Sequence, residues 1–217
     1  DIPMAVAAMR QGAFAFLEKP CAPAELITVL ERALKVRSLV LDNRRLRRLD
    51  RSGAPAARMM FGTSAKAEAL RAQVRLVAQA DGDALVTGAP GSGVSKVAEV
   101  IHLSSARSKA PFVNRAAQAL TADSLTEAMK QAKGGSLFLD EVSLMPAQLQ
   151  ITLGEDMGKR PNLCLIAGTT GDLAGEVQAG KFNADLFYRL DALRVRIPSL
   201  SERPEDIPEM FRRYVAQ

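Results

Sequence analysis

The sequence predicts an α/β protein with a mostly parallel β-sheet that helices flank on both faces. Short apolar runs such as "ALVT", "SLFL" and "CLIAG" alternate with amphipathic helical segments through residues 61–217. Strands buried on both faces form continuous apolar runs, and a helix between two strands makes those strands parallel. Hydrophobic residues make up 47% of the 217, so the chain can bury a core.

Composition excludes several classes of protein. No apolar run approaches the roughly 20 residues of a membrane helix, and we expect no signal peptide. Cys21 and Cys164 lie far apart and suggest no disulfide framework, so we expect a reduced, cytoplasmic protein. His102 is the one histidine, which excludes a His-rich metal site, and we expect it to pack or to cap a helix. The net charge of +5 permits contact with nucleic acid without arguing strongly for it.

Residues 1–35 are expected to form a helix, a strand and a second helix. The first helix ends at Gly12, and "AFAFLEKP" has the composition of a short aromatic strand closed by a proline. "PAELITVLERALKV" is amphipathic, with Leu26, Leu30 and Ala33 near one face. These elements are half of an α/β domain, and we expect the other half earlier in a longer chain.

The helical pattern continues beyond residue 35. Val36, Leu39, Asn43 and Leu46 follow one another at three- and four-residue steps, and a buried Asn in a heptad seam can fix dimer register. We therefore predict a two-stranded helical contact that makes the protein a dimer. The alternative is that the stripe packs on the chain's own core. Five arginines in residues 44–51 would form either a solvated helix face or a contact with nucleic acid. The stretch "RSGAPAA" then breaks the helix and indicates a linker.

From Phe61 onward, helices and strands alternate. Ser64 is a candidate N-cap, and Leu70, Val74 and Val77 share a face of the helix that follows it. The predicted helices are "SAKAEALRAQVRLVAQ", "VSKVAEVIHLSS", "LTADSLTEAMKQA" and "PAQLQITLGEDM". The predicted strands are "ALVTG", "PFVN", "GGSLFLDEV", "NLCLIAGTT" and "ALRVRIP".

The stretch "GAPGSGVSK", residues 88–96, has the spacing of the phosphate-binding loop G-x-x-x-x-G-K-S/T. Its glycines and Ser95 are in place, but Val94 stands where the motif has Lys. The backbone N–H groups of such a loop, with the N-terminus of the next helix, form an anion site. Taken alone, the loop is equally compatible with a tight turn between a strand and a helix.

A second element favours the phosphate loop. "SLFLDE" is an apolar strand that ends in Asp140 and Glu141. In nucleotide hydrolases of this architecture, the Asp holds Mg²⁺ through water and the Glu orients the attacking water. Two carboxylates at the end of a buried strand are costly without a purpose. The alternative is an acidic loop that caps the next helix.

Residues 61–217 resemble the central AAA+ domain of the bacterial enhancer-binding proteins, the NtrC-like activators of sigma-54 polymerase. "FGTSAKAEALRAQV" resembles the family's opening segment, and "GAPGSGVSKVAEVIHLSSAR" resembles its phosphate loop and following helix. "GGSLFLDEVSLMPAQLQ", "IAGTTGDL", "GKFNADLFYRL" and "IPSLSERPEDIP" follow its later motifs in order. The resemblance implies a P-loop AAA+ sheet, here without the family's lid.

Residues 1–35 resemble the C-terminal end of a response-regulator receiver domain, which has a flavodoxin-like fold. There "FLEKP" supplies Lys19, which in the family contacts the phosphorylated Asp, and Phe16 at its aromatic switch position. The family also places a cis peptide between Lys19 and Pro20. The expected organisation is therefore a partial receiver at 1–35, a helical linker at 36–60, and the AAA+ domain at 61–217.

The resemblance implies an ATP and Mg²⁺ site. Its catalytic residues would be Asp140, Glu141 and Arg189, its sensor Thr170, and its metal-binding side chains Asp140 and Ser95. The nucleotide would lie against the loop residues Gly88, Gly91, Ser92, Gly93, Val94 and Ser95.

The chain departs from the family's pattern at sites of chemistry. Val94 replaces the loop Lys, and Lys96, two helical residues on, points about 200° away. The family's sensor Asn is Thr170, and its first arginine finger is Asn183, which leaves Arg189 alone.

The chain also lacks room for two loops. Between His102 and Gly134, one strand and one helix use most of the residues, so the family's G-A-F-T-G-A loop that contacts sigma-54 is missing. The segment 142–161 is likewise shorter than the helix and loop that the family has at this place.

These departures favour a two-component response regulator whose AAA+ core has lost ATP hydrolysis and sigma-54 contact and acts as an assembly scaffold. In that case ATP and Mg²⁺ bind weakly or not at all. The alternatives are an active, ATP-hydrolysing sigma-54 activator and a nucleotide-binding switch that never hydrolyses. The resemblance implies a sensor histidine kinase that acts on a full receiver, and DNA that is bound through a C-terminal domain. It further implies contact with RNA polymerase and self-association as a dimer or a higher AAA+ oligomer, with no membrane partner.

Overall fold

The computed structural model describes residues 13–15, 17, 20–23, 26–38, 55–157 and 162–215. The chain divides into two compact units, residues 1–52 and residues 53–217. Each unit is described by itself.

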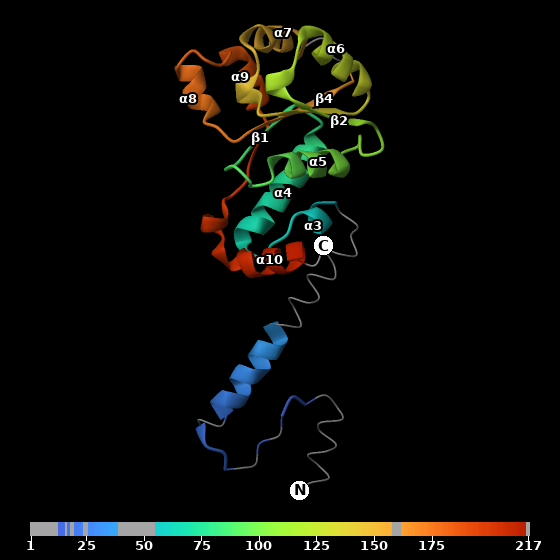
Figure 1. The fold of residues 1–217 in the computed structure, drawn as a ribbon. Helices are drawn as coiled ribbons and strands as arrows, with labels where there is room; N and C mark the ends of the chain where they lie inside the picture. Colours follow the sequence, from blue (N-terminus) through green and yellow to red (C-terminus); the bar gives the residue numbers. More distant parts are fainter. Residues whose placement is uncertain are drawn as a thin grey trace. The chain divides into compact units, whose positions relative to one another are not determined.

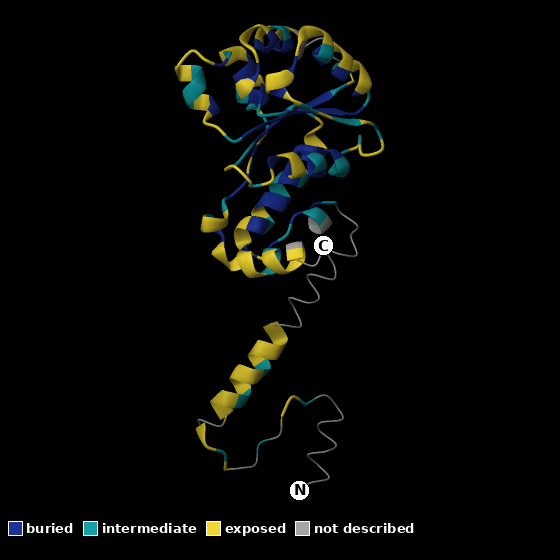
Figure 2. Cartoon of the chain, in the orientation of Figure 1, coloured by how far each residue is buried: buried dark blue, intermediate teal, exposed yellow. Residues whose placement is uncertain are grey.

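In the first unit, residues 26–38 are helical, as the sequence predicts. The apolar side chains of this helix are largely exposed within the chain, among them Leu30 and Leu34 (Figure 2). In the described part of the predicted strand, residues 13–15, 17 and 20, no strand is found. A strand needs a neighbour to complete its hydrogen bonds, and the described residues of this unit contain none.

Several predictions on the first unit and the linker lie outside the described residues. These are the receiver switch residues Phe16 and Lys19, the Lys19–Pro20 peptide bond, and the linker residues Leu39, Asn43 and Leu46. The predicted dimer seam therefore stays a prediction.

The second unit is an α/β domain in which every predicted strand and helix from residue 61 onward is present (Figure 1). The strands are β1 (Ala84–Thr87), β2 (Phe112–Ala116), β3 (Ser136–Asp140), β4 (Cys164–Thr169) and β5 (Arg194–Arg196). The helices are α3 (Pro55–Met59), α4 (Ala65–Ala80), α5 (Val94–Ser104), α6 (Ala122–Gln131), α7 (Ala147–Met157), α8 (Leu173–Gln178), α9 (Ala184–Leu190) and α10 (Ile207–Val215), with short 3-10 turns η1 (Ala117–Ala119), η2 (Val142–Leu144), η3 (Leu200–Glu202) and η4 (Pro204–Asp206).

The five strands form one parallel sheet in the order β2-β3-β4-β1-β5. One apolar cluster joins the sheet to α6, α7, α8 and α9, and a second joins its other face to α3, α4 and α5. Figure 1 shows these two helical layers on opposite sides of the sheet. Because all strands run the same way, the residues that follow β1, β3 and β4 meet at one edge.

Local signals explain how the first helices begin and pack. Ser64 caps α4 by accepting a hydrogen bond from the N–H of Ala67 at 3.0 Å, as predicted. The predicted face of this helix, Leu70, Val74 and Val77, is buried. His102, on α5, is also buried, and its Nδ1 lies 2.9 Å from the hydroxyl of Ser136, which confirms a packing role.

The second unit begins before residue 61, where the sequence analysis places the domain boundary. Ala56 is fully buried and Met60 is 8% exposed, and both belong to the cluster that contains α4 and α5. The predicted linker, residues 36–60, therefore ends in the short helix α3, which belongs to the core of the second unit.

The structure also accounts for the region in which the family's sigma-54 loop would lie. The segment between α5 and β3 contains β2, η1 and α6, and its longest stretch outside these elements is residues 105–111. The strand and helix predicted there are confirmed.

A buried carboxylate ties the two ends of the domain together. Asp206 has no exposed surface and accepts hydrogen bonds from the N–H of Thr63 at 2.7 Å and from the N–H and hydroxyl of Ser64 at 2.8 and 2.6 Å. Burial raises the pKa of this carboxyl, but the bonds from Ser64 and Thr63, with the charge of Arg203, outweigh it and leave the pKa below its ordinary value.

We therefore expect Asp206→Asn to lower the free energy of unfolding by about 2–3 kcal/mol at pH 7, because hydrogen bonds to a charged group are lost. Since the folded pKa is depressed, this stabilisation is complete above about pH 4, the unfolded value, and is lost as pH falls through the folded pKa. Urea unfolding of both proteins from pH 7 to pH 2 measures the difference in their free energies of unfolding. A difference that stays constant in acid would contradict the depressed pKa of Asp206.

Candidate functional site

The glycine loop lies between β1 and α5, as the phosphate-loop motif requires. Gly91 and Gly93 have φ of +77° and +90°, which residues with a Cβ rarely adopt. A Cβ on Gly88 would lie 2.3 Å from the hydroxyl of Ser92, so this glycine makes room for the turn. The loop leads directly into the N-terminus of α5, where backbone N–H groups lack helical partners. The residues present therefore fit a phosphate group.

Val94 occupies the position of the missing lysine and packs inward. It is 6% exposed and belongs to the core cluster beneath the sheet. A Cβ added to Gly168 on β4 would lie 2.6 Å from Val94 Cγ1 and 2.8 Å from the ring of Phe138. This side chain thus contributes to packing and gives the loop no cation.

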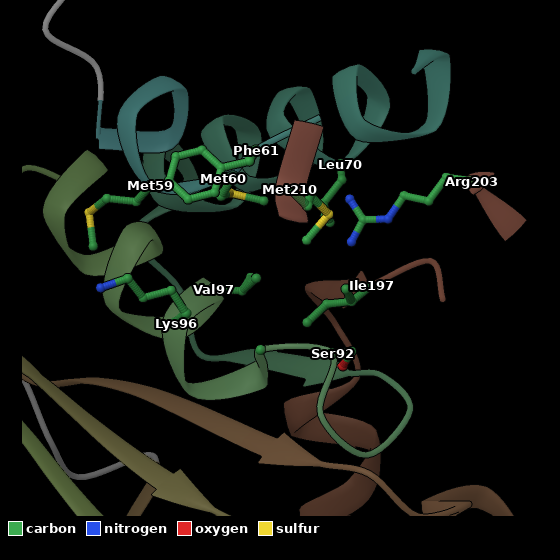
Figure 3. A pocket seen from close by; sticks show the side chains of 11 residues that line it. Met59, Met60, Phe61, Leu70, Ser92, Lys96, Val97, Ile197, Arg203 and Met210 are labelled. Carbon is green, nitrogen blue, oxygen red and sulfur yellow. The ribbon is translucent and has the colours of Figure 1, made fainter. Parts of the chain in front are cut away.

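Lys96 does not replace that cation at the loop. Its ammonium lies 2.9 Å from a carboxylate oxygen of Glu99, and both side chains are substantially exposed. Figure 3 shows the Lys96 ammonium directed away from Ser92.

Ser95 and Asp140 come together as the resemblance implies. The hydroxyl of Ser95, in the first turn of α5, lies 3.4 Å from a carboxylate oxygen of Asp140 at the end of β3. Mg²⁺ is commonly held by one or two such oxygens together with substrate phosphates and water. The described residues contain no cluster of three or more His, Cys, Asp or Glu side chains that could hold a metal by itself. A metal here would therefore depend on the nucleotide.

Glu141 is held by the sensor position. Its backbone is left-handed, with φ of 51°, and its carboxylate turns toward the end of β4. Thr170 donates its hydroxyl to Oε1 at 2.7 Å and its N–H to Oε2 at 3.1 Å, so both oxygens are engaged. The hydroxyl of Thr169 lies at the longer distance of 3.5 Å from Oε2. Both oxygens of the carboxylate that would orient water thus already accept hydrogen bonds from its own chain.

The arginine-finger region is also engaged within the chain. Asn183 caps α9 by accepting from the N–H of Leu186 at 2.8 Å, and its own N–H donates to Gln150 on α7 at the same distance. Arg189 donates from Nη1 to the carbonyl of Gly154 at 2.9 Å. Both residues therefore help to fasten α9 to α7.

A small pocket lies beside the loop, with a cavity volume of about 60 Å³. That volume is well below the roughly 300–1,000 Å³ that ligand sites in proteins commonly enclose. In Figure 3 the loop borders one side of this pocket and Arg203 points in from another. Its lining residues are Met59, Met60, Phe61, Leu70, Ser92, Gly93, Lys96, Val97, Ile197, Arg203 and Met210.

Sequence reasoning found the loop and the acidic strand end but missed this pocket. Met59 and Met60 fell in the predicted linker, and Arg203 entered only as part of the motif "IPSLSERPEDIP". The pairing of Glu141 with Thr170 was also missed. A Thr at a position that usually carries Asn was the one available signal, and it does not reveal which partner the side chain takes.

A parallel sheet in this order, with a glycine loop after β1 and an acidic pair after β3, defines a P-loop NTPase domain of the AAA+ type. The P-loop NTPase domain of an E. coli sigma-54 transport activator shares this fold, with a TM-score of 0.53 at 22% identity over 64% of this chain and 99% of that one. Residues 61–200 match the family described as "Sigma-54 interaction domain". The chain therefore belongs to the sigma-54 interaction family.

Relatives align with almost the whole chain. The transcriptional regulator DctD of Pseudomonas aeruginosa is 38% identical over 99% of this chain and 53% of its own length. NtrX of Azorhizobium caulinodans is 34% identical over 97% and 51%. NtrX from Brucella abortus, solved in complex with ADP, gives a TM-score of 0.65 at 33% identity over 96% and 52%. The chain thus spans about half the length of these relatives.

Within the described residues, no helix is long and apolar enough to cross a membrane.

The inward packing of Val94 predicts the effect of restoring the lysine. Val94→Lys should tighten ATP binding about tenfold to a hundredfold, because one charge-assisted hydrogen bond is worth roughly 1.5–3 kcal/mol. It should also lower the melting temperature, since the core loses a buried side chain. Calorimetric titration with ATP and Mg²⁺ measures the affinity, and Val94→Met is the matched uncharged control. Equal affinities for the two variants would show that a lysine at this position cannot reach the phosphates.

Proposed function

We propose that this chain is the core of a two-component transcription regulator whose AAA+ domain binds nucleotide, has lost rapid hydrolysis, and acts as an assembly scaffold. The observation that carries the proposal is the engagement of both Glu141 oxygens by Thr170. Turning this carboxylate from the end of β4 toward a water beside the terminal phosphate would break these two hydrogen bonds. Hydrogen bonds to a charged group are worth roughly 1.5–3 kcal/mol each, so that cost is added to the barrier.

Nucleotide binding itself has support from the chain and from its relatives. The loop retains its glycine geometry and the helix N-terminus behind it, and Ser95 and Asp140 lie together. When bound, Mg²⁺ would be held by Ser95 and Asp140 and would neutralise charge on the phosphates. NtrX from Brucella abortus has been solved in complex with ATP as well as with ADP. Without the loop lysine, the affinity should be weak.

Hydrolysis faces further obstacles in this chain. Asn183 stands at the first arginine-finger position and serves as a helix cap, and Arg189 is hydrogen-bonded to Gly154. An arginine finger is worth roughly 10³–10⁵ in rate, so its loss outweighs a modest loss of affinity.

The proposed regulator works without sigma-54 remodelling, since residues 103–133 contain no segment long enough for the family's contact loop. Its relatives are transcription regulators, and their roles suggest the remaining partners. A sensor kinase would phosphorylate the complete receiver and so change packing through the helix predicted at residues 36–50. The protein would act in the cytoplasm on DNA, through a region outside this chain, and on RNA polymerase.

The alternative function is an active, ATP-hydrolysing sigma-54 activator. Retention of Ser95, Asp140, Glu141 and Arg189 favours it, as does the match to the sigma-54 interaction family. It requires that nucleotide or a neighbouring subunit release Glu141 from Thr170.

Phosphate release separates the two functions. We expect turnover below about 1 s⁻¹, the low end of ordinary enzymes, with Glu141→Gln indistinguishable from the unmodified protein. A faster rate that Glu141→Gln abolishes would establish the active ATPase instead.

A further inference from the structure

The sheet of the second unit has an outer edge at each end. The strands β2 and β5 stand at the two ends of the order β2-β3-β4-β1-β5. The outer edge of an end strand presents backbone N–H and C=O groups, which form a template for pairing with a strand of another chain. A sheet with two open edges can add a copy at each end and so grow into open-ended chains.

On β2, every second residue directs its backbone polar groups away from the sheet. The N–H of Ser136 donates to the carbonyl of Pro111 at 2.9 Å, so the backbone of Pro111 faces β3. The register of β2 on β3 is regular from Phe112 to Ala116, and the backbone groups alternate between the two sides of a strand. The backbone of Asn114, at the centre of β2, therefore faces outward.

Arg115 occupies this edge at its centre. Its Nη1 donates to the outward carbonyl of Asn114 at 2.8 Å. Its Nη2 donates to Oε1 of Gln131 on α6 at 2.8 Å, and the amide nitrogen of Gln131 donates in turn to Glu127 at 3.1 Å. The guanidinium is thus held by one bond to the edge and one bond to the helix. It takes up an acceptor that an added strand would need, and it places a positive charge there.

The opposite edge of the sheet is closed in a similar way. The carbonyl of Leu193 accepts from the N–H of Leu85 on β1 at 2.9 Å, so the backbone of the next residue, Arg194, faces outward from β5. The carbonyl of Arg194 accepts from the side-chain amide of Gln73 on α4 at 2.7 Å. On both end strands, therefore, an outward carbonyl is already bonded to a side-chain donor.

We propose that Arg115 closes the β2 edge against pairing with a second copy of this chain and so confines self-association to surfaces outside the sheet. The inference goes beyond the proposed function, since it needs no nucleotide. The strand β2 has five residues and β5 has three, so β2 offers more backbone to a partner. Pairing of two β2 edges would break the Arg115 bond in both copies and bring two guanidinium groups together, and like charges on paired strands are destabilising.

The test measures self-association of the full chain by light scattering over a range of concentrations. Arg115→Thr removes both the charge and the donor, and Thr favours strands. It should raise the association constant at least about tenfold, because a charge-assisted hydrogen bond no longer has to be broken in each copy. Lys133→Thr is the matched control, because it removes the same charge from an exposed position in the turn before β3. It should leave the association constant within about twofold.

A second variant shows whether the new contact uses the β2 edge. Proline is tolerated on an edge strand where its missing N–H would have faced solvent. Adding Asn114→Pro to Arg115→Thr removes an outward donor without removing a bond between β2 and β3. The double variant should therefore return to the association constant of the unmodified protein. Association that persists in the double variant, or equal association in Arg115→Thr and Lys133→Thr, would overturn the inference.

Amide hydrogen exchange of the unmodified protein gives an independent result if Arg115→Thr does not fold. The N–H of Asn114 faces outward on a closed edge, whereas the N–H of Val113 faces β3. At high protein concentration, the amide of Asn114 should exchange at least about tenfold faster than that of Val113. Equal protection of the two amides would show that the edge is already paired and would overturn the role of Arg115.

Discussion

The Asp206 carboxylate is the constraint on which the pocket beside the glycine loop depends. Its hydrogen bonds to Thr63 and Ser64 join segments that are 142 and more residues apart in the chain. One segment carries Met60 and Phe61, and the other carries Arg203, so the same contact positions two walls of the pocket. The depressed pKa of Asp206 follows from these bonds, which means that the contribution of this contact to stability depends on pH.

The sheet supplies the other half of the site. Parallel strands bring the ends of β1, β3 and β4 to one edge, where the loop, Asp140 and Thr170 meet. The residues that replace the family's chemical groups have structural contacts there or nearby. Val94 packs into the core, Asn183 caps a helix, and Thr170 binds Glu141. Restoring the family's residues at these positions would therefore disturb packing as well as restore charge.

Local sequence patterns predict most of the secondary structure of this domain, but they do not predict its contacts between distant residues. The five strands and the helices α4, α5, α6 and α7 are evident from apolar runs and helical periodicity, whereas α8, α9 and α10 were not predicted. Strand topology then places Asp140 beside Ser95. The role of α3 was not predicted, because a short segment after a Gly-Pro break has no periodicity to reveal its burial. Arg203 and the Glu141–Thr170 pair depend on contacts between distant residues, which single-sequence patterns do not encode.

The central claim is that the site holds nucleotide while Glu141 remains bound to its own chain. The most direct measurement is a crystal or cryo-EM structure of this chain prepared with ATP and Mg²⁺. We expect an intact triphosphate on the loop, with Thr170 still within hydrogen-bond distance of both Glu141 oxygens. An empty loop, or Glu141 turned away from Thr170 toward the terminal phosphate, would contradict it.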